Sequence, residues 1–516
     1  MVAILTAIFV IAFISLIGFF VNVWHRSGYW KRRGIPGPEN GGLFTGNLDD
    51  LFTFEFPYVV KLYEWSKQYG SFYGFREGWM RVLVISDVQM VQEMLVKKFE
   101  CFQGRKLNPL VGDVDKDPKI HLFNARGTRW KRLRTIANPS FSVANLKKLT
   151  PLVFDSISNM MIHLDQAYEK RKPFNIHLYF HELTMDVIGR VALGQKESKV
   201  FKNPNVEIAK KIFYSFSEDK FSYFAAMFPF FAPWLRKIHL ATMKFRGQPL
   251  FGLMKDLYGE IYRRMKERAE GKHTESIDFI DLFLDGKSDE IYDDPIFNKR
   301  KLRISKTLTV DEIAYQCIIF ILAGFDTTAN SSAVMCYYLA KNPSIQKRLQ
   351  EEIDDIVGED DATYGHTQEL RFLDACFNES LRLVPVATFA TTRQCCESTT
   401  LGNLYVEKGT EVCVDAFSLH RNRELWGDDA DEYVPDRWFS TTQDHHLAFT
   451  AFGGGPRTCI GMRLAQLEEK MAMIEILKKY TIKECPETEK KIELIGMTTI
   501  APKSVTVTLE KRQQHK

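Results

Sequence analysis

The residues best suited to chemistry lie in a glycine-rich segment, 452–461, that contains one cysteine. It reads Phe-Gly-Gly-Gly-Pro-Arg-Thr-Cys-Ile-Gly, and a helical pattern follows from Met462 to about Tyr480. Cys459 should therefore lie near a helix N-terminus, where unpaired N–H groups favour an anion. This position and the charge of Arg457 lower the expected pKa of the thiol, and the thiolate is the form that acts as nucleophile or metal ligand.

Two chemistries suit a stabilised thiolate. Nucleophilic catalysis needs a base beside the sulfur, and the histidines nearest in sequence are His445 and His446 upstream and His515 downstream. Soft-metal ligation is the other, because a lone cysteine thiolate can be an axial ligand of haem iron. An ordinary buried cysteine in a turn before a helix is the alternative without chemistry.

Two further segments place polar side chains on predicted helices. Trp130 and Arg134 are four residues apart, so they share a helix face and suit a carboxylate partner. The segment 323–328, Ala-Gly-Phe-Asp-Thr-Thr, lies in the middle of a long helix that a capping box at 309–312 opens and Asn-Pro at 342–343 ends. A carboxylate and a hydroxyl there are unusual for packing alone, and a satisfied polar kink is the alternative.

The segment 452–461 matches F-x-x-G-x-R-x-C-x-G at all five fixed positions, and the chain resembles the cytochrome P-450 superfamily of haem-thiolate monooxygenases. The microsomal animal branch with drug- and steroid-oxidising enzymes is most similar. The other matches follow in the family's order: Trp130 with Arg134 as W-x-x-x-R, Asp326 with Thr327 in A-G-x-D/E-T-T, Glu379 with Arg382 as E-x-x-R, and Pro435-Asp436-Arg437-Trp438 in place of P-E-R-F.

The resemblance implies a mainly α fold with a small β region, in which haem b lies between the long central helix and the cysteine loop. Cys459 would be the iron ligand. Asp326 and Thr327 would be catalytic and would manage the protons that dioxygen activation consumes. The remaining cofactor-binding residues would be Trp130, Arg134, Arg393, Arg457 and Phe452, of which the first three would hold the haem propionates.

The resemblance also assigns structural roles. Glu379, Arg382 and Arg437 would form a buried cluster that supports the cysteine loop, and Asp436 and Trp438 are mild departures from the family's glutamate and phenylalanine. The turn at 496–500 would reach into the substrate pocket.

Residues 2–23 contain no charge and match a bilayer core of about 30 Å as a helix. Basic residues follow the run instead of preceding it, which argues against a cleaved signal peptide and keeps the rest of the chain cytosolic. We expect a transmembrane anchor at 1–24, a basic, Pro/Gly-rich hinge at 25–50 and a haem-binding catalytic domain at 51–516. The expected location is the endoplasmic reticulum membrane, with a single pass; a buried core helix is the alternative.

Composition adds few constraints. A net charge of +4 gives little nucleic-acid signal, and nine cysteines without paired spacing predict reduced thiols. The segment 213–235 carries phenylalanines at 213, 216, 221, 224, 228, 230 and 231, broken by prolines at 229 and 233, and predicts two short helices with a loop. By resemblance this segment roofs the substrate pocket and touches the membrane. The segment 285–306 is rich in charge and predicts a mobile surface loop.

No G-x-G-x-x-G follows a predicted strand, so the resemblance implies a separate NADPH–cytochrome P-450 reductase, with cytochrome b5 as an accessory partner. Candidate docking cations are Lys131, Arg132, Lys470, Lys478 and Lys479. The implied function is monooxygenation of an apolar small molecule, with xenobiotic, steroid and fatty-acid substrates all open. The alternatives are a haem-thiolate isomerase or dehydratase, and a non-catalytic, membrane-anchored haem or lipid carrier.

Overall fold

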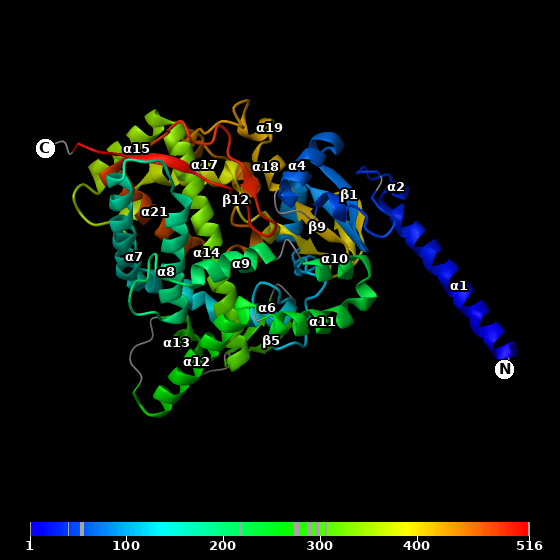
Figure 1. Cartoon of the computed structure of the whole chain (residues 1–516). Helices are drawn as coiled ribbons and strands as arrows, with labels where there is room; N and C mark the ends of the chain where they lie inside the picture. Colours follow the sequence, from blue (N-terminus) through cyan, green and yellow to red (C-terminus); the bar gives the residue numbers. More distant parts are fainter. Residues whose placement is uncertain are drawn as a thin grey trace.

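The computed structural model describes residues 2–39, 41–51, 56–215, 219–246, 248–272, 278–285, 290–294, 299–304 and 307–513. Helices make up most of it, and the strands form small sheets, the largest of which lies beside the helical body (Figure 1). The predicted mainly α fold with a small β region is therefore confirmed.

The helices differ widely in length, and the long ones form the body of the molecule. The α-helices are α1 (Val2–Ser27), α2 (Tyr29–Arg32), α3 (Leu48–Leu51), α4 (Tyr58–Tyr69), α5 (Val88–Gln92), α6 (Gly127–Ala137), α7 (Val143–Glu169), α8 (His177–Leu193), α9 (Asn205–Ser215), α10 (Lys220–Met227), α11 (Ala232–Phe245), α12 (Pro249–Ala269), α13 (Phe279–Leu284), α14 (Val310–Lys341), α15 (Pro343–Ile356), α16 (His366–Glu369), α17 (Arg371–Leu383), α18 (Ala416–His420), α19 (Arg423–Trp426), α20 (Gln443–Ala448) and α21 (Met462–Lys479). A π-helical turn, η1 (Glu93–Lys97), continues α5, and the 3-10 turns are η2 (Asn138–Phe141), η3 (Pro229–Phe231), η4 (Thr388–Thr391), η5 (Pro435–Phe439) and η6 (Gly455–Arg457).

The strands are short and mostly antiparallel. They are β1 (Phe72–Glu77), β2 (Met80–Ile85), β3 (Phe174–Asn175), β4 (Glu290–Asp294), β5 (Lys299–Ile304), β6 (Arg393–Gln394), β7 (Thr399–Leu401), β8 (Leu404–Val406), β9 (Glu411–Val414), β10 (Tyr480–Lys483), β11 (Leu494–Ile495), β12 (Ala501–Pro502) and β13 (Thr506–Lys511). The largest sheet has the order β1-β2-β9-β6, with β2 and β9 parallel. It carries Arg393 at its edge strand β6, so this sheet positions one of the predicted cofactor residues.

Helix α14 is the axis of the helical body, and most of it is buried. Its N-terminus has the predicted capping box: Glu312 N donates to Thr309 Oγ1 at 3.2 Å, and Thr309 N donates to the Glu312 carboxylate at 3.1 Å. The helix ends at Lys341, before the predicted Asn-Pro stop. These local signals fix both ends of the element that carries Asp326 and Thr327.

Helix α8 packs along the middle of α14, where a glycine permits close approach. A Cβ on Gly324 would lie 3.1 Å from Ile188 Cδ1. One residue on, the Thr184 hydroxyl of α8 donates to the Phe325 carbonyl at 2.8 Å. Because serine and threonine bonds to helix carbonyls perturb the helical ladder, α8 modifies α14 next to the predicted catalytic residues.

Within the described part of the chain, two helices, α1 and α14, are long and apolar enough to cross a membrane, and of these α1 is exposed and α14 is mostly buried. Helix α1 projects from the body next to α2 and β1 (Figure 1). Near its end, the Phe19 ring stacks on Phe44 and Trp79 and meets Phe230 edge-on, with centroids 6.1–6.2 Å apart. Helix α1 is therefore the candidate membrane anchor, and α14 is a core helix.

The segment after α1 packs against β1. The Trp30 indole is buried and donates to the Phe75 carbonyl at 2.8 Å, and Gly74 N donates to the Pro36 carbonyl at 2.8 Å. A Cβ on Gly37 would lie 1.9 Å from the Gly74 carbonyl oxygen. The glycine in this Pro/Gly-rich stretch thus allows contact between two backbones.

Two predictions about surface segments meet different outcomes. The aromatic segment folds as predicted into short helices, α10 and the start of α11, separated by η3; Phe216 lies outside the described residues. The predicted loop at 285–306 is wrong in part, because β4 and β5 pair as an antiparallel hairpin over its described residues. All nine cysteines are free, as predicted.

Candidate active site

The cysteine loop is closed by its own backbone. Cys459 N donates to the Phe452 carbonyl at 2.9 Å, and Gly453 N donates to the Thr450 carbonyl at 2.8 Å. The turn η6 lies inside this loop, and α21 begins three residues after Cys459. The predicted turn leading into a helix is therefore present, with the sulfur next to the first N–H groups of α21.

Glycine 455 is required because the loop lies against the π-helical turn η1. Gly455 has φ +64°, and a Cβ there would lie 2.0 Å from the Leu95 carbonyl oxygen. Both the left-handed backbone and the close approach exclude a side chain. The turn η1 is thus a backing surface that sets the path of the cysteine loop.

The Cys459 thiol lies beside open space but inside the protein mass. Its side chain is exposed, whereas burial raises the pKa of the thiol; hydrogen bonds from the backbone at Gly461 and Met462 and the charges of Arg134 and Arg105 oppose that effect. The two observations fit a side chain that lines an internal space. The expectation of a lowered pKa is wrong for the protein alone, because desolvation outweighs the helix N-terminus, and the helpful charges are Arg134 and Arg105 in place of Arg457.

Buried arginines gather on this side of the molecule. Arg393 is fully buried and donates to the Ala390 and Thr392 carbonyls, and Arg105 also donates to the Ala390 carbonyl. Arg457 donates to the Phe123 and Ala125 carbonyls, and its guanidinium lies over the Trp130 ring, 4.9 Å from the centroid. These bonds hold the guanidiniums in place without neutralising them.

The charge of this arginine group, defined as Arg105, Arg134, Arg393 and Arg457, is incompletely compensated. Burial and the Arg105 charge lower the pKa of Arg393 and of Arg457 well below the usual value, and burial lowers that of Arg105 to about 10. Four buried donor atoms of this arginine group have no hydrogen-bond partner among the described residues: Arg393 Nε and Nη2, Arg105 Nε and Arg457 Nε. Unpaired buried charges are costly, so this group fits an anion with several oxygens.

The donor set fits haem. A haem b carries two propionate carboxylates, which suit the arginine group, and its iron accepts a thiolate such as Cys459. Arg105 was missed in the sequence, where it stands in a loop without a motif. The charges of Arg134 and Arg105 act on the Cys459 thiol, and the Arg457 guanidinium lies over the Trp130 ring. Phe452 contributes its carbonyl to the loop, and its ring stacks on Phe377 at 6.1 Å.

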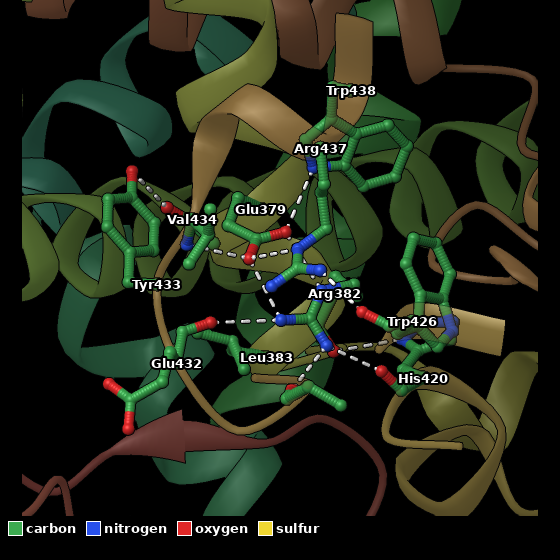
Figure 2. Close-up of polar contacts among 12 residues, drawn as sticks. Glu379, Arg382, Leu383, His420, Trp426, Glu432, Tyr433, Val434, Arg437 and Trp438 are labelled. Carbon is green, nitrogen blue, oxygen red and sulfur yellow. Dashed lines mark hydrogen bonds and ion pairs between the residues drawn. The ribbon is translucent and has the colours of Figure 1, made fainter. Parts of the chain in front are cut away.

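A buried carboxylate, that of Glu379, joins two segments that are distant in sequence (Figure 2). Arg382 Nε and Nη2 bind the two Glu379 oxygens at 2.8 Å each, and Arg437 Nε binds Oε1 at 3.0 Å. Glu379 and Arg382 are fully buried. The remaining Arg382 donors reach the His420, Ala430 and Glu432 carbonyls. The cluster predicted from E-x-x-R therefore forms, with all three charged residues in contact.

Trp438 belongs to this cluster and is more than a mild replacement. Its indole Nε1 donates to Glu379 Oε2 at 3.0 Å, a bond that a phenylalanine could not make (Figure 2). Asp436 lies outside the cluster and pairs with Arg348 at the surface. The Trp438 bond gives the buried carboxylate a further donor, which lowers the cost of its burial.

His420 connects the cluster to the cysteine loop and was also missed in the sequence. Its Nδ1 lies 3.0 Å from the Arg382 carbonyl, and its Nε2 accepts from Thr450 N at 3.0 Å. Since Nε2 accepts, Nδ1 carries the proton and the ring is neutral. The chain of contacts thus runs from Glu379 through Arg382 and His420 to Thr450, two residues before the cysteine loop.

The two predicted catalytic residues point in different directions from α14. Ala323 is exposed and Thr327 is half-buried on a helix that is mostly buried, and the Thr327 hydroxyl donates to the Ala323 carbonyl at 2.7 Å. The Asp326 carboxylate is buried and accepts from Asn330 Nδ2 and Thr499 Oγ1. Thr327 thus borders open space, whereas Asp326 is turned away from it.

Another thiol of the chain, Cys413 on β9, is buried and does not line an open space. It is 1% exposed, its sulfur lies 3.4 Å from the Tyr58 hydroxyl, and burial raises the pKa of its thiol to about 12. A neutral thiol packed in a sheet is a poor candidate for a metal ligand.

Most of the predicted docking cations are already engaged. The prediction of Lys470 as a surface cation is wrong, because its side chain is buried and bonded to Asp374 and the Thr367 carbonyl. Arg132 binds Glu312, Lys478 binds the Asp360 carbonyl and Lys479 binds Asp165. These side chains serve the fold in the free protein.

The chain is similar to known proteins over nearly its whole length. The family model described as cytochrome P450 matches residues 36–509. Cytochrome P450 cyp-13B1 of Caenorhabditis elegans is 40% identical over 513 residues, which cover 98% of this chain and 99% of that protein. Cytochrome P450 CYP13A8 of the same organism is 39% identical over 515 residues, covering 98% of this chain and 100% of the relative.

The backing of the loop by η1 generates a first prediction. Gly455→Ala should destabilise the fold by about 2 kcal/mol or more and lower haem retention, because the new Cβ meets a backbone oxygen in a left-handed conformation. The matched control is Gly461→Ala, where a Cβ would make only an ordinary 3.6 Å contact with Phe141. Haem per protein after purification, with thermal melting, measures both. Equal haem retention in the two variants would contradict the role assigned to Gly455.

The neutral His420 generates a second prediction. Burial lowers its pKa to about 3 from 6.5. Between these values the unfolded chain binds a proton that the folded chain does not, so the unfolding free energy falls as pH decreases. From pH 7 to pH 5 we expect the wild-type protein to lose about 2 kcal/mol more than His420→Gln. Urea unfolding at both pH values measures the difference; His121 and His177, also neutral, contribute alike in both proteins. A difference of zero would refute the neutral buried ring.

Proposed function

The chain belongs to the cytochrome P450 family, and on this premise we propose that it uses haem b, held by Cys459, to insert one oxygen atom of O2 into an apolar small molecule. The observation that carries the proposal is the pairing of a thiol beside internal open space with an arginine group whose buried donors lack partners among the residues that the structure describes. Electrons would come from NADPH through a separate, membrane-bound cytochrome P450 reductase, with cytochrome b5 as an accessory donor.

Each element of the site has a role in this proposal. When bound, the haem supplies the oxidative chemistry, and a thiolate ligand favours O–O cleavage. The arginine group and Trp130 would hold the propionates, and the N–H groups at the start of α21 would stabilise the negative sulfur. Ala323 and Thr327 would face the cofactor from the other side and limit the water that reaches it.

The acid–alcohol pair favours monooxygenation over the alternatives. Thr327 would position a proton donor at the open side of α14, and Asp326 would supply the proton. Isomerases and dehydratases of this kind consume no NADPH, and a carrier of haem or lipid needs neither residue. NADPH-dependent oxygen uptake with a reductase separates the three functions, because only the monooxygenase requires both cosubstrates.

The surface around α10 and α11 supports an apolar substrate and a membrane. Phe224, Phe231, Trp234 and Ile238 are exposed, and they line a shallow apolar hollow together with Phe228 and Leu235. A patch of this kind marks an interaction site. We infer that it rests in the lipid surface beside α1, in the endoplasmic reticulum membrane with the catalytic domain in the cytosol, so that xenobiotics, steroids or fatty acids can enter from lipid.

The ligand assignment gives a third prediction. Cys459→Ala should abolish the red-shifted Soret band of the reduced carbonyl complex, because no thiolate remains on the iron. Cys413→Ala is the matched control and should keep the band, since its thiol packs against Tyr58. Carbonyl difference spectra of both variants measure this. A band that survives in Cys459→Ala and disappears in Cys413→Ala would overturn the assignment.

The hydroxyl at the open side of α14 gives a fourth prediction. Thr327→Ala should retain haem but divert about tenfold more of the NADPH electrons to hydrogen peroxide, because the proton donor is no longer positioned. Thr328→Ala, at a buried position one residue on, is the control and should not share the effect. The ratio of product to NADPH measures coupling, with substrates chosen by binding spectra across the three classes. Full coupling in Thr327→Ala would exclude the proton-delivery role.

A further inference from the structure

Two histidines lie one helical turn apart on α8, at the point where this helix packs against α14. His177 and His181 are 4% and 7% exposed, and their ring centroids are 4.1 Å apart. The His181 ring also stacks on Phe325 of α14 at 5.0 Å. This histidine pair was not singled out in the sequence, and the function proposed above does not use it.

The Asp326 carboxylate faces the pair and not Thr327. Its Oδ1 lies 3.6 Å from His181 Nε2. Its Oδ2 accepts from Asn330 Nδ2 at 2.9 Å and from Thr499 Oγ1 at 2.5 Å. The acid predicted to be catalytic is therefore held behind α14, on the side of α8.

The two histidines differ in what they can do. His177 Nε2 is bound to Asn330 Oδ1 at 2.8 Å, and burial lowers the pKa of this histidine to about 3, so it stays neutral. His181 has no hydrogen bond within the described residues from either ring nitrogen, although both are buried. Its free Nε2 points at a carboxylate, so His181 is the member of the pair suited to carry a proton.

The electrostatics of Asp326 agree with this division. Burial alone would raise the pKa of the carboxyl, but the contacts with His181 and Thr499 outweigh it and hold the pKa below its usual range. The titratable groups that face His181 are Asp326 from α14 and His177 from its own helix, while Lys210 of α9 acts on His177. Among the residues that the structure describes, no group of histidine, cysteine and carboxylate side chains could hold a metal ion.

We propose that His181 is a positioning residue for proton delivery: it holds ionised Asp326 on the α8 side and passes a proton to it, which frees the carboxyl to turn toward Thr327. In this step the N–H bond at His181 Nε2 breaks and an O–H bond forms at Asp326 Oδ1. The imidazolium and the carboxylate both become neutral, so the ion pair that held the side chain is lost. No electron moves, and the inference rests on the proposed monooxygenase function.

The first test measures coupling in the full-length holoenzyme with reductase. His181→Gln retains a polar side chain that cannot titrate, and it should keep the haem and its carbonyl spectrum while the ratio of product to NADPH falls about tenfold. His177→Gln is the matched control, equally buried and one turn away, and should change the ratio less than twofold. Equal losses in the two variants would mean that α8 packing is responsible, and would overturn the proposal, as would a His181→Gln variant that couples like the wild-type protein.

The second test reads the pair without turnover. In the ferrous carbonyl form, nitrogen-15 spectra of labelled histidine at one fixed pH resolve the ring signals of His181, identified by the signals missing from His181→Gln. Asp326→Asn should shift these signals, because the carboxylate that lies 3.6 Å from Nε2 is replaced by a neutral amide. Unchanged signals refute the pairing. If the wild-type protein forms no product with NADPH, the proposed function fails, and this second measurement still decides whether His181 and Asp326 share a proton.

Discussion

The neutralisation of one buried carboxylate, Glu379, organises the cluster that supports the cysteine loop. Glu379 has no access to water, and it is satisfied by Arg382, Arg437, Trp438 and the Val434 amide. Removing one partner of such a group leaves an uncompensated buried charge, which costs about 3–5 kcal/mol. Helix α17 and turn η5 are therefore locked together, and the lock extends through His420 to the start of the cysteine loop. The position of the sulfur depends on contacts made far from it in sequence.

In the arginine group, by contrast, buried charges are not neutralised by carboxylates. Arg105, Arg393 and Arg457 are buried with backbone carbonyls as partners, and their charges repel one another. Such an arrangement opposes folding of the protein alone, and an anionic ligand would relieve it. The protein therefore couples its own stability to occupancy of the site, since a ligand that binds only the folded chain stabilises it by mass action.

Local patterns in the sequence predicted what depends on neighbouring residues. The cysteine loop, the capping box and limits of α14, and the ion pair within α17 all have signals a few residues long. Tertiary contacts decided the rest. Arg105 has no motif, His181 lies more than a hundred residues before Asp326, and Trp438 gains its role only because η5 folds over α17. The sign of the thiol pKa shift also failed, because sequence shows the helix N-terminus but not the desolvation around Cys459. Lys470 was predicted as a surface cation for the same reason, because the residues next to it in sequence do not show that its side chain is buried.

The contact of α1 with the aromatic surface has a practical consequence for preparing the protein. The Phe19 ring packs against the rings of Phe44, Trp79 and Phe230 and covers part of each. Removing residues 1–27 to improve expression would expose these rings further, beside the exposed Phe231 and Trp234. Contiguous apolar surface of this kind promotes self-association. A truncated form would therefore need polar replacements on this face, in addition to loss of the first helix, before it behaved as a monodisperse sample.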